Sequence, residues 1–143
     1  MPNKYLKNLI LFKIIFGDIM KEHSLKDSFK DALNGIVVPI RKERNLNIHI
    51  VIMILAIIAG FLLKISKAEW IICIILFSLV ISAEIMNFAI ENAINYTRSV
   101  TKDEDHKLAG IAKDASAGAV LVLATASAII GLVIFIPKII ELI

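Results

Sequence analysis

The sequence has very little of what stabilises small disulfide-linked or zinc-binding domains. It contains one cysteine, Cys73, and three histidines among 143 residues. A single thiol excludes an intrachain disulfide, and too few ligands remain for a structural zinc site. Cys73 lies inside an apolar run, where we expect it to be a small buried or lipid-facing side chain.

Linkers and glycine-rich phosphate-binding loops are also missing. The chain has only six glycines and three prolines, and it has no internal repeat. A chain of 143 residues is expected to form one domain. Neither the G-x-x-x-x-G-K-[ST] loop nor the protein-kinase motifs occur. Any nucleotide must therefore be bound by other groups.

Charge is absent from long stretches of the chain. Apolar residues make up 58% of the sequence, against about 45–50% in average soluble domains. A membrane-spanning helix needs about 20 mostly apolar residues, and three stretches qualify, at about 46–64, 69–96 and 115–137. The sequence predicts an all-α integral membrane protein with three transmembrane helices.

The basic residues predict the orientation of these helices. Nine Lys and Arg precede residue 46 and four lie in the 97–114 loop, but only two lie in the 64–69 turn. Because cytoplasmic segments are enriched in Lys and Arg, we expect the amino terminus and the second loop to be cytoplasmic.

The region before the first span is predicted to contain a helix that does not cross the membrane. Residues 24–38 are amphipathic, and Ser24 with Asp27 three residues later forms a plausible capping pair. We expect this helix on the cytoplasmic membrane surface, since there is little soluble core against which it could pack. Residues 1–23 are expected to form an interfacial or frayed extension without a signal peptide.

The second span carries a row of polar side chains at spacings i, i+3, i+7 and i+11, namely Glu84, Asn87, Glu91 and Asn95. These spacings place them on one face of a helix. Ionisable groups at membrane depth cost at least ~2.5 kcal/mol each, so they indicate function. The alternative, a stripe that only joins helices by hydrogen bonds, explains the asparagines better than the two carboxylates.

The depths of the two carboxylates suggest different roles. Glu84 follows Trp70 by 14 residues, which is roughly 21 Å at about 1.5 Å per residue. A carboxylate there suits a general base for a hydroxyl group. Glu91 lies closer to water, where a carboxylate suits a hard cation such as Mg²⁺.

Polar residues near the other spans have less specific patterns. Lys113, next to Asp114 at the start of the third span, suits either a phosphate contact or a membrane-surface anchor. The acidic run at 103–105 is most simply a solvated face. Taken alone, Glu43 is a surface carboxylate among basic residues, and His49 is an interfacial histidine with a satisfied hydrogen bond.

Two of these segments together resemble the prokaryotic diacylglycerol kinase family. E84-I-M-N-F-A-I-E91 is similar to the family's E-x-x-N-[ST]-A-x-E signature, and H106-K-L-A-G-I-A-K-D114 is similar to its H-x-L-A-x-x-A-K-D block. The resemblance extends from about residue 28 to the end of the chain. It implies a homotrimer of three-helix subunits with a surface helix, which transfers the γ-phosphoryl group of ATP to a lipid hydroxyl.

The resemblance also implies roles for individual residues. Glu84 would be the general base, and two further carboxylates would hold Mg²⁺ with the nucleotide phosphates, Glu43 and Glu91. Asn87 and Asn95 would support the polar row around the substrate. The remaining matched residues would contact or border ATP: Lys113, Asp114, Glu104, Asp105 and His106.

The segment E43-R-N-L-N-I-H49 and the tail from Ile129 to Lys138 resemble the undecaprenol kinase branch of the family more than the diacylglycerol kinase branch. Phosphorylation of undecaprenol is therefore the first hypothesis, and phosphorylation of diacylglycerol is the alternative. An alternative of another class is a non-catalytic channel or scaffold subunit with a polar seam.

Three positions depart from the family pattern. Asn95 stands where the family usually has an Asp, and Phe88 stands where it usually has Ser or Thr. Ser24 lies near the position of an Arg that often contacts the nucleotide, and Lys26 could substitute for that Arg. The first removes a charge beside the predicted metal site. None removes the predicted base or metal ligands, so we expect activity to be retained.

Overall fold

The computed structural model describes residues 24–101 and 107–141, which form four α-helices and no strand. The extension at 1–23 and the loop residues Glu104, Asp105 and His106 lie outside the described residues, so the hypotheses about them stay predictions. The chain divides into two compact units, 1–35 and 36–143.

Helix α2, Leu25–Lys42, begins in the first unit and ends in the second. The backbone N–H of Asp27 donates to Ser24 Oγ at 3.2 Å, and that hydroxyl donates to the Asp27 carboxylate at 2.7 Å. The predicted capping pair is thereby confirmed. The helix continues past the predicted end at residue 38, where Arg41 and Lys42 interact favourably with the carboxyl end of the helix dipole. A position on the membrane surface remains a prediction.

Three further helices are long and apolar enough to cross a membrane: α3, Arg44–Leu62; α4, Lys67–Val100; and α5, Lys107–Ile140. The 19 residues of α3 extend about 28 Å at ~1.5 Å per residue, close to the hydrocarbon thickness of ~30 Å. The 34 residues of α4 and of α5 extend about 51 Å each.

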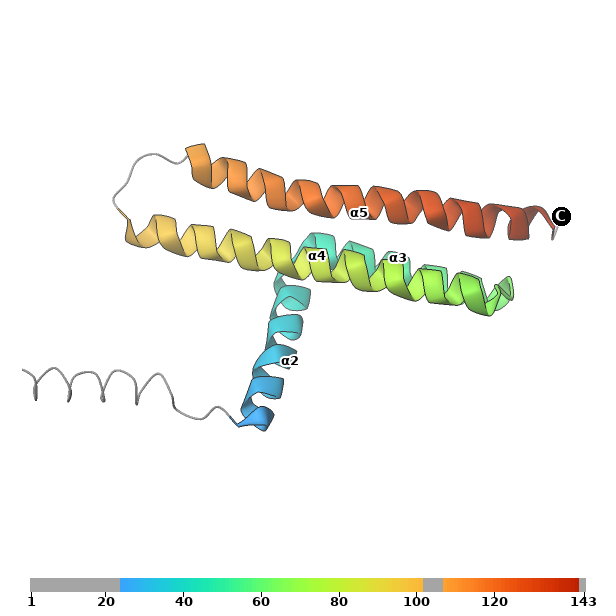
Figure 1. Ribbon diagram of the computed structural model, residues 1–143, viewed down its shortest axis with the longest axis horizontal. Coiled ribbons are helices and arrows are strands. Elements are labelled where there is room, and N and C mark those ends of the chain that lie inside the picture. Colours follow the sequence, from blue (N-terminus) through green and yellow to red (C-terminus); the bar gives the residue numbers. More distant parts are fainter. Residues whose placement is uncertain (1–23, 102–106, 142–143) are drawn as a thin grey trace, which may run out of the picture. The chain divides into compact units, whose positions relative to one another are not determined.

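A tight turn fixes one end of α3 to α4. Lys64 adopts the left-handed conformation with φ 51°, and the Ile65 N–H donates to the Gly60 carbonyl, as in a Schellman cap. Ser66 and Glu69 then form a capping box at the start of α4. Because α3 ends and α4 begins at this turn, the extra length of α4 lies at the opposite end of the bundle (Figure 1).

Helix α4 is central, since it packs against α5 along much of its length and against α3. Near the turn, Ile65, Cys73 and Ile134 form a buried cluster with Trp70 and Phe77 beside it. Cys73 is thus buried, which is one of its two expected locations.

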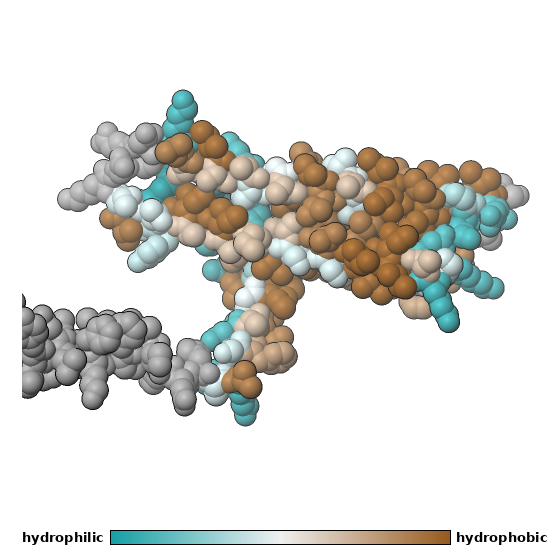
Figure 2. All heavy atoms as spheres, in the orientation of Figure 1, coloured by the Kyte–Doolittle hydropathy of each residue, from teal (hydrophilic) through white to brown (hydrophobic). Residues whose placement is uncertain are grey.

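The outer surfaces of the three helices are largely apolar, as a bilayer requires. Large side chains on α5 are about two-thirds exposed, among them Leu121, Val122 and Val133. Figure 2 shows hydrophobic residues over much of the three helices and hydrophilic residues towards their two ends. The protein is therefore a multi-pass membrane protein with an all-α fold.

Candidate functional site

The polar row of α4 faces the two neighbouring helices. Glu84 contacts α3, whereas Asn87, Glu91 and Asn95 all contact α5. The site is therefore built on three long helices, and its side chains are positioned by rigid elements rather than by loops.

The most deeply buried polar side chain is that of Glu84. It is 3% exposed, and among the described residues it is the one charged side chain in the buried class. Its Oε1 lies 3.2 Å from Nε2 of His49 on α3. An imidazole N–H at this distance holds the carboxylate in one orientation and partly compensates its removal from water.

Sequence reasoning missed the role of His49, although a signal was present. His49 is five residues after Arg44, where α3 begins, which is about 7.5 Å into the helix. Glu84, placed from Trp70, lies about 9 Å from the same boundary of a ~30 Å layer. Similar depths on consecutive antiparallel helices make a contact between the two side chains possible, but depth alone does not say whether they face each other.

One turn along α4 from Glu84, Asn87 connects the helix to α5. The Ser116 hydroxyl lies 2.6 Å from Asn87 Oδ1 and 2.8 Å from the Lys113 carbonyl, and shares its single proton between these two acceptors. Asn87 therefore contacts α5 through a hydrogen bond that the sequence did not identify, and its support of the substrate site stays a prediction.

The next turns bring a predicted metal ligand and a predicted phosphate contact together. Lys113 Nζ lies 2.5 Å from Glu91 Oε1 and 3.2 Å from Asn95 Oδ1. The side chains of Lys113 and Glu91 are 27% and 37% exposed, so water reaches this end of the site. Asn95, the residue that departs from the family pattern, contributes a neutral acceptor to the lysine.

Glu43 precedes α3 as its N-cap residue, but its side chain makes no capping hydrogen bond. It is close enough to Glu84 for their charges to interact. The described residues contain no group of three or more His, Cys, Asp or Glu side chains that could hold a metal. The roles of Glu43 and Glu91 as metal ligands therefore remain predictions.

Asp114 is not brought into this group. It is exposed on α5 and lines neither of the two cavities of the site. Since successive residues of a helix point about 100° apart, its side chain is directed away from that of Lys113. Its predicted contact with ATP remains a prediction.

The first cavity, which we call the polar cavity, has a volume of about 290 Å³. Asn45 and His49 of α3, Glu84 and Asn87 of α4, and four apolar residues of α5 line it: Ala117, Val120, Leu121 and Ala124. A small hydroxyl-bearing group can therefore approach the Glu84 carboxylate.

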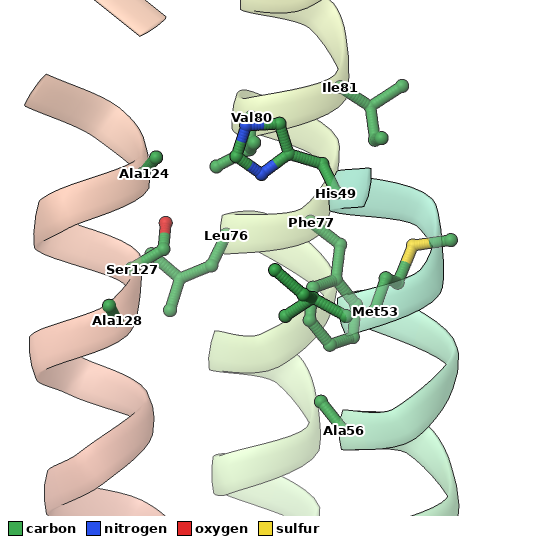
Figure 3. A pocket seen from close by; sticks show the side chains of 11 residues that line it. His49, Met53, Ala56, Leu76, Phe77, Val80, Ile81, Ala124, Ser127 and Ala128 are labelled. Carbon is green, nitrogen blue, oxygen red and sulfur yellow. The ribbon is translucent and has the colours of Figure 1, made fainter. Parts of the chain in front are cut away.

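The second cavity, which we call the apolar groove, has a volume of about 270 Å³ and continues from His49 towards the α3–α4 turn (Figure 3). Its walls come from α3, α4 and α5: Ile52, Met53, Ala56, Leu76, Phe77, Val80, Ile81, Ala124, Ser127 and Ala128, with His49 at one end. His49 and Ala124 line both cavities, so the two are neighbours.

Comparison with known proteins identifies the family. The family model described as prokaryotic diacylglycerol kinase matches residues 30–135. An undecaprenol kinase of Bacillus subtilis (strain 168) is 43% identical over 111 residues, covering 78% of this chain and 87% of the relative. A diacylglycerol kinase of Synechocystis sp. is 32% identical over 115 residues, covering 80% of this chain and 64% of the relative.

No solved structure matches the chain. Because the family model covers most of the sequence and both relatives are named kinases, the channel or scaffold alternative has no support. The chain belongs to the prokaryotic diacylglycerol kinase family.

Proposed function

We propose that the protein is an ATP- and Mg²⁺-dependent kinase that converts undecaprenol into undecaprenyl phosphate at the cytoplasmic membrane interface. The observation that carries the proposal is a buried carboxylate, Glu84, which lines a cavity at membrane depth and is held by His49. The 43% identity with an undecaprenol kinase supports undecaprenol as the acceptor.

In this mechanism Glu84 is the general base. The lipid hydroxyl enters the polar cavity, and its oxygen attacks the γ-phosphorus of ATP while Glu84 accepts the hydroxyl proton. The bond from the γ-phosphorus to the β-phosphate oxygen breaks, and ADP leaves. His49 keeps the carboxylate pointing into the cavity during the transfer.

Glu91 and Lys113 provide the nucleotide end of the site. They lie beyond Asn87 towards the exposed end of α4, with Glu91 about 10 Å along the helix from Glu84. Phosphates that bind here would meet the ammonium group of Lys113, which acts as a point charge. The hydroxyl and the γ-phosphate would then meet near Asn87 and Ser116.

Glu43 and Glu91 are the residues that would hold Mg²⁺, because both offer carboxylate oxygens near the expected phosphates. When bound, the ion neutralises charge on the phosphates during transfer. The part that these side chains play is to place the nucleotide in line with the acceptor oxygen, since positioning supplies much of the catalysis of such reactions.

The proposal also includes the orientation of the helices in the membrane and the assembly of the subunits. The overhanging ends of α4 and α5 lie on the cytoplasmic side, in keeping with the positive charge of the amino-terminal region and the second loop. A homotrimer, implied by the family resemblance, would use part of the exposed apolar surface of the helices. This assembly is an expectation that a cross-linking or mass measurement in detergent would check.

A kinase assay with two acceptors tests the proposed function. The purified protein is supplied with ATP labelled at the γ-phosphate and with vesicles that contain either undecaprenol or diacylglycerol. We expect labelled undecaprenyl phosphate. Product from diacylglycerol alone would replace the substrate assignment with the second candidate, which the 32% identical relative favours. Product from neither lipid would overturn the kinase assignment.

A further inference from the structure

The mechanism above uses the polar cavity but leaves the apolar groove unassigned. Leu76, Phe77 and Val80 of α4 lie between walls formed by α3 and α5. Small side chains on those walls, Ala56 and Ala128 among them, leave room that larger residues would fill (Figure 3).

The groove lies next to the cavity that Glu84 lines. His49, whose imidazole contacts Glu84, stands at one end of the groove, and Ala124 lies on the boundary between the two cavities. A molecule that lies in the groove can therefore place its end group in the polar cavity. Since one cavity is lined mainly by apolar side chains and the other includes four polar ones, their combined chemistry matches a long hydrocarbon with a terminal hydroxyl group.

We propose that the apolar groove binds the hydroxyl-proximal part of a polyprenol chain. This inference rests on the proposed kinase function and identifies where the hydrocarbon part of its substrate lies. The rest of the long chain would lie in the bilayer.

The length of the groove fits a short part of such a chain. Leu76 precedes Glu84 by eight residues, which is about 12 Å along α4. With carbon–carbon bonds of about 1.5 Å, an extended chain of roughly ten carbon atoms covers this distance. Because each isoprene unit contributes four carbon atoms to the main chain, this corresponds to about two to three isoprene units.

A hydroxyl in the wall of the groove favours an unsaturated chain. Ser127 lines the groove, and within the described part of the chain its buried Oγ has no hydrogen-bond partner. A buried hydroxyl without a partner is costly. The carbon–carbon double bonds of a polyprenol are weak acceptors for such a proton, whereas the chain of a saturated lipid has none.

Filling the groove tests the proposal. In Ala128→Phe, the added ring would occupy the groove some distance from Glu84. We expect kcat/KM for undecaprenol to fall about tenfold or more, as for other steric changes in apolar pockets. A prenol of one isoprene unit, too short to reach residue 128, should react as in the unmodified protein, and ATP binding should not change.

A matched variant controls for the added ring itself. Ala126 lies on the same helix, is exposed and lines neither cavity, so Ala126→Phe should leave the kinetics with both alcohols unchanged. Equal loss with the long and the short alcohol in Ala128→Phe, or no loss with either, would overturn the proposal. A changed assembly size in Ala128→Phe alone would instead assign the groove to a second copy of the chain, which also overturns it.

A photoreactive substrate gives an independent measurement on the unmodified protein. The probe is a prenol that carries a diazirine about ten carbons from its hydroxyl group. We expect cross-links to peptides containing residues 76–81 or 124–128, and loss of these cross-links when undecaprenol competes. Labels spread evenly over the three helices, or displaced equally by membrane phospholipid, would contradict the proposal. An unmodified protein that phosphorylates no alcohol would refute the proposed function itself, which separates the two failures.

Discussion

Replacing the predicted base by its amide should abolish turnover while it preserves the structure. Glu84→Gln keeps the shape of a side chain that is only 3% exposed, and the amide oxygen can still accept a hydrogen bond from His49. The amide cannot accept the substrate proton. Because general bases contribute about 10²–10⁴-fold to rates, we expect kcat to fall by that factor, or about 3–5 kcal/mol in the barrier.

The assay for this variant follows transfer of labelled phosphate to undecaprenol in vesicles, with nucleotide binding measured separately. Glu141→Gln, which changes an exposed carboxylate just beyond the end of α5, serves as the control and should remain fully active. Turnover of Glu84→Gln within twofold of the unmodified protein would refute the assigned base. Normal nucleotide binding together with lost turnover would exclude misfolding as the cause.

The contact between Glu84 and His49 extends this prediction to a second residue. Hydrogen bonds to charged groups contribute about 1.5–3 kcal/mol, so His49→Gln should lower kcat by roughly 10–100-fold at ~1.4 kcal/mol per tenfold. If His49 acts only by positioning Glu84, the double variant should be no slower than Glu84→Gln alone. Additive losses would show that His49 acts independently of the carboxylate.

Three other substitutions test separate parts of the structure. Glu91→Gln should raise the Mg²⁺ concentration needed for half-maximal activity several-fold, since one predicted ligand loses its charge, and an unchanged metal titration would count against that role. Gly60→Ala should lower the free energy of unfolding by about 1–3 kcal/mol, because a Cβ atom would lie 2.9 Å from the Trp70 ring. This loss would be measured as a lower temperature of thermal inactivation. Gly131→Ala is the control and should not destabilise, because its new methyl group would have no neighbouring atom within 4 Å. Lys64→Gly should raise the free energy of unfolding by about 1 kcal/mol, because Lys64 adopts a left-handed conformation that glycine adopts without strain. A lower inactivation temperature would contradict this prediction.

Features that depend on one helix at a time could be predicted from the sequence. The long uncharged runs predicted three spans, since only their length and hydropathy matter. The spacing of Glu84, Asn87 and Glu91 predicted one polar face, since a helix has a fixed period. Both predictions required no knowledge of the neighbouring helices.

Features that depend on how helices are aligned with one another could not be predicted in the same way. The pairing of His49 with Glu84 requires the relative displacement of α3 and α4, which their connecting turn determines. Likewise, the contact between Glu91 and Lys113 depends on how α4 and α5 are aligned, and their expected roles towards a metal and a phosphate stay predictions. A pattern of residues in one helix carries no information on which partner a side chain meets first.

The contact between Glu91 and Lys113 has a consequence for the enzyme when no nucleotide is bound. Each charge already has its counterion before any nucleotide arrives, so the interface is never left with an exposed, uncompensated carboxylate or ammonium at this pair. On the proposed mechanism, nucleotide binding would require this pair to separate, so that Lys113 could face the phosphates and Glu91 could help to hold Mg²⁺.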